Sequence, residues 1–483
     1  MKDISRNLTM LFDFYELTMG NGYFEKGMGD RIVYFDLFYR DNPDHGGYAI
    51  AAGLEQIVDY INRLHFDDND IEYLRSKKLF SENFLAYLKT FSFTGDIWAV
   101  PEGTVIFPGE PLITVRARAV EAQFIETYML CMINHQSLIA TKASRIVRAA
   151  DGRPVSEFGS RRAQGADAAI LGARAAYIGG ASSTACTISD EAFGVPASGT
   201  MAHSWVQMFD SEYEAFRTYC EVYPHAATLL VDTYNVLKSG IPNAIRAFKD
   251  VLLPQGITKC GIRIDSGDVT YLTKKARRML DDAGLYECKI VISNSLDEYL
   301  IREMLQQGAQ IDAFGVGERL ITAKSDPVFG AVYKLAAVED ENGNVIPKIK
   351  VSENPGKITT PHFKKTYRLY SNESAKAEAD LVCIHDEHID ITKPLEIFDP
   401  EYTWKRRTME DYTANELMVQ VFRGGKQVYK LPQLDEIRDR CKASLGSIWE
   451  EVLRFENPHN YYVDLSEKLW QLKHDMINEY RNK

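Results

Sequence analysis

Apolar residues recur along the chain at two spacings, and the dominant spacing changes near residue 150. In the segment 51–64 they fall on one face at helical spacing, at Leu54, Ile57, Val58, Ile61 and Leu64. This spacing predicts an amphipathic helix. From residue 94 to residue 118, short β-branched runs separated by Gly and Pro predict strands joined by tight turns. We therefore interpret residues 1–145 as an N-terminal α+β domain.

From residue 150 onward, short apolar strands alternate with amphipathic helices. The predicted strands are 155–158, one near Val195, 227–231, 260–264, 289–292, 311–317 and 332–338. The helices between them include Ala166–Tyr177, one after Pro242, one from the capping residue Asp268 to Gly284, and one that ends at Gly308. Continuously apolar strands are typical of a parallel sheet covered by helices on both faces. Residues 146–345 are thus predicted to form an α/β domain, and periodicity leaves open whether its sheet closes into a barrel.

The last part of the chain has a different texture. Residues 340–365 are rich in Gly, Pro and Asn and predict an exposed connection. We interpret residues 346–483 as a smaller C-terminal domain that ends in a long helix over 465–483.

Composition and charge narrow the class of protein. A chain of 483 residues with 45% hydrophobic and 26% charged residues is typical of a globular protein of two or three domains. Its net charge of -12, without a cluster of basic residues, argues against nucleic acid or an anionic membrane as a partner. The seven cysteines are scattered without a C-x-x-C pair, which favours free thiols in a reducing compartment over disulfides or a zinc site. With no apparent signal peptide and no long apolar run, the sequence predicts a soluble, cytoplasmic protein.

Polar and glycine residues gather where the predicted α/β strands end, which is where ligands bind in parallel α/β folds. These candidates are Arg161, Arg162, Thr200, His203, Ser204, Asp232, Arg263, Asp265, Asp268, Asn294, Ser295, Gly315 and Gly317. Each has an ordinary structural alternative. Asp268 is expected only to cap a helix. The alternative for His203 is an ordinary packed histidine, and the alternative for Arg161 and Arg162 is pairing with surface acids. The glycines fit any tight turn, so no single residue decides the function.

Several motifs occur together in one order, and their combination is more specific than any one of them. They are DFYELTM, EFGSRRAQG, GGASSTACTISDEAFGVPASGTMAHSW, LLVDTYN, CGIRIDSGD and FGVGERLIT. Over residues 8–340 the chain resembles the nicotinate phosphoribosyltransferase family. The resemblance implies a type II phosphoribosyltransferase fold, with an irregular α/β barrel core, an α+β N-terminal domain and a smaller C-terminal domain. It also implies a homodimer whose active sites are shared between subunits.

The resemblance also implies roles for particular residues. Tyr15 and Phe158 match the aromatic residues that sandwich the pyridine ring, and His203 matches the histidine that ATP phosphorylates. Thr200, Arg161 and Arg263 match nicotinate or phosphoribosyl contacts, and Asp265 matches a ribose contact. We further expect Ser204 to contact substrate and Asn294, Ser295, Gly315 and Gly317 to bind phosphate. One departure is Glu318, where relatives often have Thr or Ser, so no phosphate contact is expected of its carboxylate.

Elementary chemistry agrees with these roles. Aromatic faces and an arginine fork suit an anionic ring, and its nitrogen is a nucleophile that needs no general base. A carboxylate such as Asp265 stabilises positive charge on the ribose, while Mg²⁺ neutralises the departing pyrophosphate. Asp232 is our candidate for fixing the tautomer of His203. The predicted reaction joins nicotinate to phosphoribosyl pyrophosphate with ATP hydrolysis, as a step of NAD salvage.

Three alternatives remain beside this prediction. A nicotinamide or other pyridine phosphoribosyltransferase has the same fold but does not need an arginine fork. A TIM-barrel sugar-phosphate isomerase or aldolase typically needs a lysine or paired acids at strand ends, and Lys334 is the one lysine near such a position. A ligand-sensing relative without activity is disfavoured by His203, Asp265 and Arg263.

Overall fold

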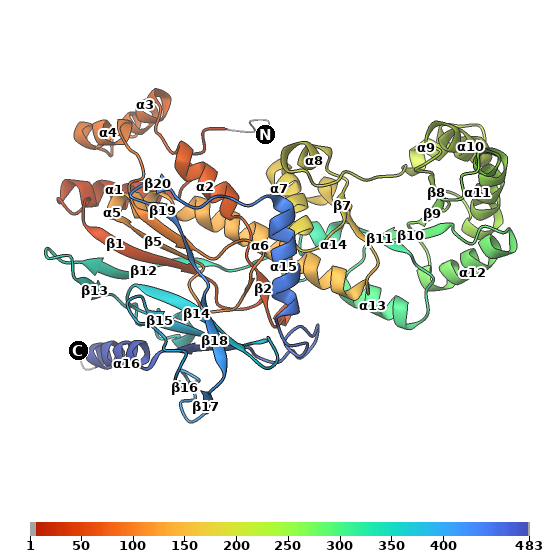
Figure 1. Ribbon diagram of the computed structural model, residues 1–483. Helices are drawn as coiled ribbons and strands as arrows, with labels where there is room; N and C mark the ends of the chain where they lie inside the picture. The colour runs from red at the N-terminus through yellow and green to blue at the C-terminus, as the bar shows by residue number, and fades with distance from the viewer. Residues whose placement is uncertain (1–5, 482–483) are drawn as a thin grey trace. The chain divides into compact units, whose positions relative to one another are not determined.

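The computed structural model describes residues 6–481 and divides the chain into two compact units (Figure 1). One unit comprises residues 139–327. The other comprises the described residues up to 138 and those from 328 onward. The boundary at residue 138 lies within helix α6 (Glu126–Ala149). The predicted domain edges at residues 145 and 345 stay a prediction, because compactness does not test where independently folding domains end.

The unit of residues 139–327 is built on six parallel strands. Their spatial order is β7 (Ser183–Thr184), β6 (Val155–Glu157), β11 (Ala313–Val316), β10 (Lys289–Asn294), β9 (Gly261–Ile264) and β8 (Thr228–Leu230). This is the chain order taken around a ring, with one break between β7 and β8, which do not pair in the described chain. The order confirms the prediction of an irregular α/β barrel core.

The helices of this unit follow its strands. They are α7 (Ala166–Ile178), α8 (Thr187–Phe193), α9 (His203–Gln207), α10 (Glu212–Val222), α11 (Ile241–Ala247), α12 (Val269–Asp282), α13 (Glu298–Gln306) and α14 (Glu318–Ile321). The predicted helix ends are confirmed: the Asp268 side chain accepts a hydrogen bond from the backbone N–H of Tyr271, and Gly284 adopts a φ of 79° just beyond α12. Pro242 lies in the first turn of α11.

Two expectations about this unit were wrong. The segment near Val195 forms a single bridge between Ala197 and Thr184 instead of a strand. The run 332–338 does not close the parallel series: it forms β12 (Val332–Glu339), which pairs antiparallel with β1 (Ile32–Phe38) in the other unit. An apolar run shows that a strand is buried but not which neighbour it pairs with, so the sequence pattern alone was insufficient here.

The second unit contains a seven-stranded sheet. Its order is β13 (Val345–Pro347), β12, β1, β5 (Ile113–Arg118), β3 (Asp96–Ala99), β19 (Val419–Arg423) and β20 (Lys426–Gln427). Strands β1, β5 and β3 come from the first 118 residues, and strands from beyond residue 330 flank them on both sides. The N-terminal and C-terminal parts of the chain therefore share one sheet.

The remaining strands of this unit form smaller sheets. They are β18 (Tyr412–Glu416), β14 (Lys364–Ser371), β15 (Ala377–Ile384) and β21 (Tyr462–Leu465) in a four-stranded sheet, with the pairs β16 (Leu395–Phe398) and β17 (Arg406–Met409), and β2 (Ala49–Ile50) and β4 (Val105–Ile106). In the four-stranded sheet, Arg368 Nη2 and Asp380 Oδ2 form a fully buried ion pair at 2.6 Å. Removing either partner would leave the other as an uncompensated buried charge, which destabilises the fold.

The helices of the second unit lie before β3, between β5 and α6, and near the C-terminus. They are α1 (Phe14–Glu25), α2 (Leu54–Arg63), α3 (Asp68–Ser76), α4 (Glu82–Lys89), α5 (Ala119–Phe124), α15 (Leu434–Gly446) and α16 (Glu467–Arg481). The predicted helix over 51–64 is confirmed as α2, and the predicted terminal helix as α16, while residues 482–483 of that prediction lie outside the described residues. Within residues 6–481, no helix is both long and apolar enough to cross a membrane.

Candidate active site

Arg263 is the centre of a polar network at the carboxyl ends of the parallel strands. Its Nη1 donates to Thr200 Oγ1 at 2.9 Å and to the carbonyl oxygen of Met201 at 3.1 Å. Its Nε donates to Ser293 Oγ at 2.7 Å, and its Nη2 donates to Asp265 Oδ1 at 3.1 Å. The side chain is only 13% exposed, so the guanidinium is held rigidly. The sequence predicted three of these residues as site residues, and the structure brings them together.

Two aspartates extend the network. Ser293 Oγ donates a short hydrogen bond to Asp265 Oδ1. The backbone N–H of Asp265 donates to Asp232 Oδ2 at 3.0 Å, and Ser266 Oγ donates to the same oxygen at 2.6 Å. Asp232 Oδ1 is buried without a hydrogen-bond partner in the described chain. A buried carboxylate oxygen in this state is suited to a cation or a donor on a ligand.

Phe158 lies beside this network because two glycines leave room for it. A Cβ atom on Gly315 would lie 2.4 Å from Phe158 Cδ2, and one on Gly317 would lie 3.2 Å from the Phe158 carbonyl oxygen. The backbone N–H of Phe158 donates to the carbonyl oxygen of Val316 at 2.8 Å. The Arg263 guanidinium carbon lies 5.8 Å from the centroid of the Phe158 ring. An aromatic face and a guanidinium are thus held together at the strand ends.

His203 is the first residue of α9 and is half-buried. Its Nδ1 lies 3.1 Å from Thr233 Oγ1. The hydrogen bonds of Asp232 lead to residues 265 and 266 instead, so within the described chain the hydrogen-bonding neighbour of the imidazole is Thr233. The expectation that Asp232 fixes the tautomer of His203 has no contact to support it.

The other predicted residues are more exposed and lie around this centre. Arg161 and Arg162 are exposed in the turn Ser160–Arg162, and no hydrogen bond joins Arg161 to the Arg263 network in the described chain. Ser204 is exposed in α9. Asn294, the last residue of β10, and Ser295 are exposed, and Asn294 Oδ1 accepts a 2.6 Å hydrogen bond from the backbone N–H of Ser295.

Glu318 begins α14, directly after Gly317. Its Oε1 lies 2.6 Å from Lys324 Nζ, and this ammonium lowers the pKa of the carboxyl group. The carboxylate that departs from the family pattern is therefore paired within its own segment.

Three buried or half-buried polar residues of the site were missed by sequence reasoning: Glu157, Thr233 and Ser293. Each directly neighbours a residue that was selected. Glu157 and Ser293 are buried, at 0% and 4% exposed. A signal was present for Glu157, because a carboxylate between the apolar residues Val155 and Phe158, in a strand expected to be buried, requires partners inside the protein.

Tyr15 lies in the second unit, in α1, and is 45% exposed. Its hydroxyl donates to the Glu126 carboxylate, and partial burial together with Glu126 raises its pKa. The adjacent Glu16 is fully buried and accepts a hydrogen bond from Thr127 Oγ1. Burial raises the pKa of Glu16 to about 8, with Glu126 and Asp13 adding in the same direction.

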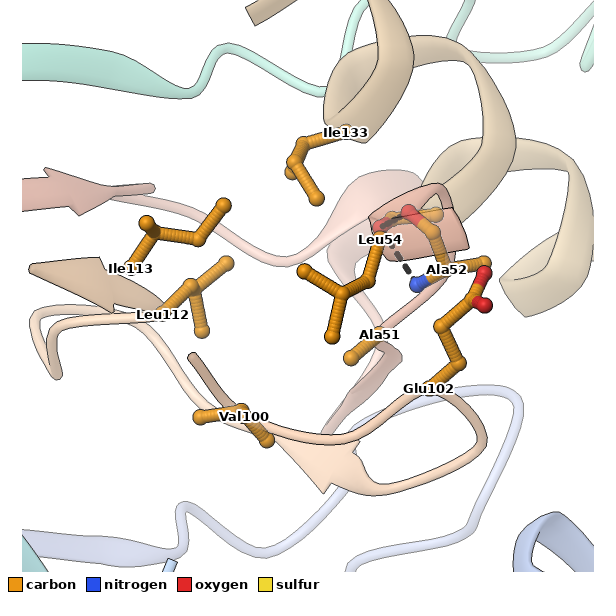
Figure 2. A pocket seen from close by; sticks show the side chains of 9 residues that line it. Ala51, Ala52, Leu54, Val100, Glu102, Leu112, Ile113 and Ile133 are labelled. Carbon is orange, nitrogen blue, oxygen red and sulfur yellow. Dashed lines mark hydrogen bonds between the residues drawn. The ribbon is translucent and has the colours of Figure 1, made fainter. Parts of the chain in front are cut away.

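The second unit also encloses a cavity of about 10 Å³. Figure 2 shows the apolar side chains of Leu54, Leu112 and Ile113 around it, with Glu102 at its edge. The space is about that of one water molecule, so it has no room for a pyridine ring. It is a packing gap and not a substrate site.

Known proteins share both the sequence and the fold of this chain. Family models described as the N-terminal and C-terminal domains of nicotinate phosphoribosyltransferase match residues 10–134 and 363–473. Nicotinate phosphoribosyltransferase of Bacillus subtilis is 42% identical over 99% of this chain and 96% of its own length, and that of Caenorhabditis elegans is 32% identical over 97% and 93%. The crystal structure of human nicotinic acid phosphoribosyltransferase superimposes with a TM-score of 0.84 at 27% identity, covering 96% of this chain and 99% of that chain.

The interrupted ring of parallel strands, its polar carboxyl ends and these similarities define a class of enzyme, the phosphoribosyltransferases with an irregular α/β barrel. Within this class, the chain belongs to the nicotinate phosphoribosyltransferase family.

Proposed function

We propose that the protein forms nicotinate mononucleotide and pyrophosphate from nicotinate and phosphoribosyl pyrophosphate, coupled to ATP hydrolysis, as a salvage step toward NAD. The observation that carries this proposal is the Arg263 guanidinium, fixed by four hydrogen bonds beside the Phe158 ring. A cationic group next to an aromatic face is complementary to a planar ring that bears a carboxylate.

The existing contacts of Arg263 refine its role. A guanidinium has five N–H donors, and the contacts to Thr200, Met201, Ser293 and Asp265 use four of them. One N–H on Nη2 is left for a ligand, so a two-bond fork from this arginine alone does not fit. We assign the second contact with the nicotinate carboxylate to Arg161, which is exposed on the segment that follows Phe158.

The transfer step needs positioning and charge stabilisation more than proton transfer. The pyridine nitrogen attacks C1 of the ribose, and the bond from C1 to pyrophosphate breaks with its electron pair leaving on the pyrophosphate. Asp265, held by Arg263 and Ser293, stabilises the positive charge that develops on the ribose. We propose that backbone N–H groups around Asn294 and Ser295, at the end of β10, and around Gly315 and Gly317, at the end of β11, bind phosphate oxygens.

A Mg²⁺ ion is expected to accompany pyrophosphate, and the residues present fit such an ion. Asp232 Oδ1 is a buried anionic oxygen without a partner in the described chain, and hard oxygen ligands are those that Mg²⁺ prefers. No group of three or more ligating side chains occurs among residues 6–481, which agrees with an ion held mainly by phosphate oxygens and water. When bound, the ion neutralises charge on the leaving group.

ATP is proposed to phosphorylate His203. The Nε2 atom attacks the γ-phosphorus, and ADP leaves with the electron pair of the broken bond. Thr233 Oγ1, 3.1 Å from Nδ1, fixes the ring so that Nε2 is the reacting nitrogen. We propose Ser204, in the same turn, as a neighbouring substrate contact.

We further propose a homodimer in which Tyr15 contributes to the partner's site. The outer face of α1 and the residues before it expose large apolar side chains at Leu11, Phe14, Tyr15 and Met19, between 38% and 48% exposed. Contiguous exposed apolar side chains support an interface, and a two-fold dimer buries two copies of the same surface. We place the enzyme in the cytoplasm, in agreement with the seven free cysteines, and without nucleic acid or membrane partners.

The test is incubation of the protein with phosphoribosyl pyrophosphate, Mg²⁺ and ATP, with nicotinate or nicotinamide as acceptor. We expect mononucleotide from nicotinate and little from the amide. Equal use of both acceptors would favour the broader pyridine phosphoribosyltransferase. An isomerase or aldolase is disfavoured because Lys334 lies in the antiparallel strand β12 and not at the end of a parallel strand.

A further inference from the structure

Glu157 is a fully buried carboxylate at the end of β6 and contacts two site segments at once. One oxygen, Oε1, accepts a short hydrogen bond from the backbone N–H of Gly159. The other, Oε2, accepts a 2.7 Å hydrogen bond from Thr184 Oγ1, in the neighbouring strand β7. The side chain therefore joins the segment after β6 to the segment after β7.

A buried charge without a basic partner destabilises the fold, and Glu157 has no ion-pair partner in the described chain. Burial raises the pKa of its carboxyl group, while the two hydrogen bonds lower it. The backbone N–H of Gly159 can only donate, and the Thr184 hydroxyl, which already accepts from the backbone N–H of Cys186, donates its own proton to Oε2, so the side chain between them accepts twice. A carboxylate offers two accepting oxygens, whereas an amide of the same shape offers only one. The geometry thus explains why a charged residue occupies this buried position.

Thr184 carries the connection onward to the segment that bears Thr200 and His203. Its backbone N–H donates to the carbonyl oxygen of Pro196 at 2.9 Å, and its carbonyl oxygen accepts from the backbone N–H of Ser198 at 2.8 Å. Its hydroxyl also accepts from the backbone N–H of Cys186 at 3.0 Å. Residues 196–198 are therefore tied by backbone bonds to the same threonine that binds Glu157.

The segment after β6 is held on its other side by β11. A Cβ on Gly159 would lie 2.6 Å from the Ile321 side chain and 2.7 Å from the Gly317 carbonyl oxygen, so this backbone is in close contact with the chain after β11. With Phe158 hydrogen-bonded to Val316, the segment has one fixed neighbour at β11 and one at β7. Glu157 provides the side-chain contact to β7.

We propose that Glu157 is a positioning residue that fixes the separation between the Phe158–Arg161 segment and the Ser198–His203 segment, and thereby sets the affinity for nicotinate. The inference rests on the proposed function, because Phe158, Arg161 and Thr200 are its proposed nicotinate contacts. Glu157 touches no substrate itself and acts through Gly159 and Thr184.

Glu157→Gln separates this role from a purely structural one. Removing a buried charge relieves the cost of its desolvation, so thermal unfolding is expected to stay at the wild-type temperature or above it. The amide oxygen can accept only one of the two bonds, and its NH2 group would meet Thr184 Oγ1, which already accepts from the backbone N–H of Cys186, so the hydroxyl proton loses its acceptor. We therefore expect KM for nicotinate to rise about 10- to 100-fold, as for a small displacement of a binding group. The value of kcat should change much less, because the displaced groups are proposed to bind nicotinate equally in the ground state and in the transition state.

Thr184→Val and Thr184→Ser test the same hydrogen bond from its other end. They form a matched pair, and their result does not depend on whether a Glu157 variant folds. Valine removes the hydroxyl at similar volume and should raise KM for nicotinate as Glu157→Gln does. Serine keeps the hydroxyl, so KM should stay near the wild-type value. The double variant Glu157→Gln/Thr184→Val should raise KM no further than the more impaired of the two single variants, because both substitutions remove the same hydrogen bond.

The outcomes are distinguishable. Wild-type protein that makes no mononucleotide contradicts the proposed function and, with it, this inference. An active wild type combined with an unchanged KM in Glu157→Gln and Thr184→Val, or equal effects of Val and Ser at position 184, overturns the role of Glu157 alone.

Discussion

Thr200 Oγ1 accepts a 2.9 Å hydrogen bond from Arg263 Nη1, although the two residues are 63 positions apart in the sequence. The parallel order of the barrel strands makes the contact possible, since segments that follow different strands meet at one edge of the sheet. The same arginine also holds Asp265, so one side chain connects the proposed nicotinate contact to the proposed ribose contact.

Arg263→Ala should weaken nicotinate binding by about 2–5 kcal/mol, the range for removing one partner of a buried charge pair. Nicotinamide, which lacks the charge, should lose less. Arg263→Lys keeps the charge but not the planar set of donors and serves as the control. Calorimetric titration of both ligands measures the difference, and equal losses would assign Arg263 to the sugar phosphate that both reactions share.

His203→Ala should abolish ATP hydrolysis and acid-labile labelling by γ-labelled ATP, while a slow ATP-independent transfer persists. Thr233→Val keeps the imidazole but removes the contact to Nδ1, and labelling should slow by about 10-fold, a typical effect of losing a group that orients a histidine. Undiminished labelling of His203→Ala would place the phosphate on another residue. Asp232→Asn is the comparison, measured at saturating Mg²⁺ because Asp232 is also the proposed Mg²⁺ contact: its labelling rate should be less affected than that of Thr233→Val if Thr233 orients the ring.

Tyr15→Ala should weaken nicotinate binding by about 0.5–1.5 kcal/mol beyond the loss of buried area and leave the fold intact, because the ring is half-exposed. Mixing Tyr15→Ala with His203→Ala and allowing subunit exchange should restore activity above that of either variant alone. In shared sites, a heterodimer has one site with both defects and one with neither. Native mass spectrometry monitors the subunit exchange. If heterodimers form and activity does not recover, Tyr15 contributes to the active site of its own chain.

Glu16 should make the stability of the second unit depend on pH. Its folded pKa is about 8 against an ordinary value of 4.5, so the folded carboxyl keeps its proton where the unfolded chain releases it. Its stabilising contribution is complete below pH 4.5, declines as the pH rises, and is lost above pH 8. One pKa unit corresponds to about 1.4 kcal/mol, so a loss above about 1 kcal/mol is expected across this range.

The control for Glu16 is Glu16→Gln, which has the same shape without a titrating proton. Thermal unfolding of the two proteins, followed from pH 5 to pH 9, should show the wild type losing stability relative to the variant. Parallel curves would mean that Glu16 is ionised in the folded protein throughout.

The sequence predicted elements that local chemistry determines. The strand 260–264 and the helix after it were predictable because an apolar run is followed by Asp268, whose carboxylate caps the next helix. The sequence could not show that β12 returns to pair with β1 some 300 positions earlier, since pairing partners leave no local periodicity.

Within the site, the motif residues Arg263, Thr200 and Asp265 were predictable as a group, and the structure joins them by hydrogen bonds. The residues that hold these site residues in place were not predictable in the same way. Whether Thr233 or Asp232 faces His203 depends on the turn of the chain after β8, which two adjacent polar residues do not reveal. A carboxylate in a strand that is expected to be buried indicates that Glu157 has hydrogen-bond partners. The sequence does not identify them, because the partner Thr184 is 27 positions away.

The order of strands in the seven-stranded sheet has a consequence for biosynthesis. The strands of this sheet that are made first, β1, β3 and β5, lie in the middle, and their two outer edges are covered by β12 and β19, which are synthesised more than 200 positions later. The outer side of β1 has no neighbour until residue 339 has been synthesised, and the outer side of β3 has none until residue 423, by which time the unit of residues 139–327 already has all of its strands. Nascent chains that stop before β19 should therefore bind chaperones through an open sheet edge, and the completed C-terminal part closes that edge when it arrives.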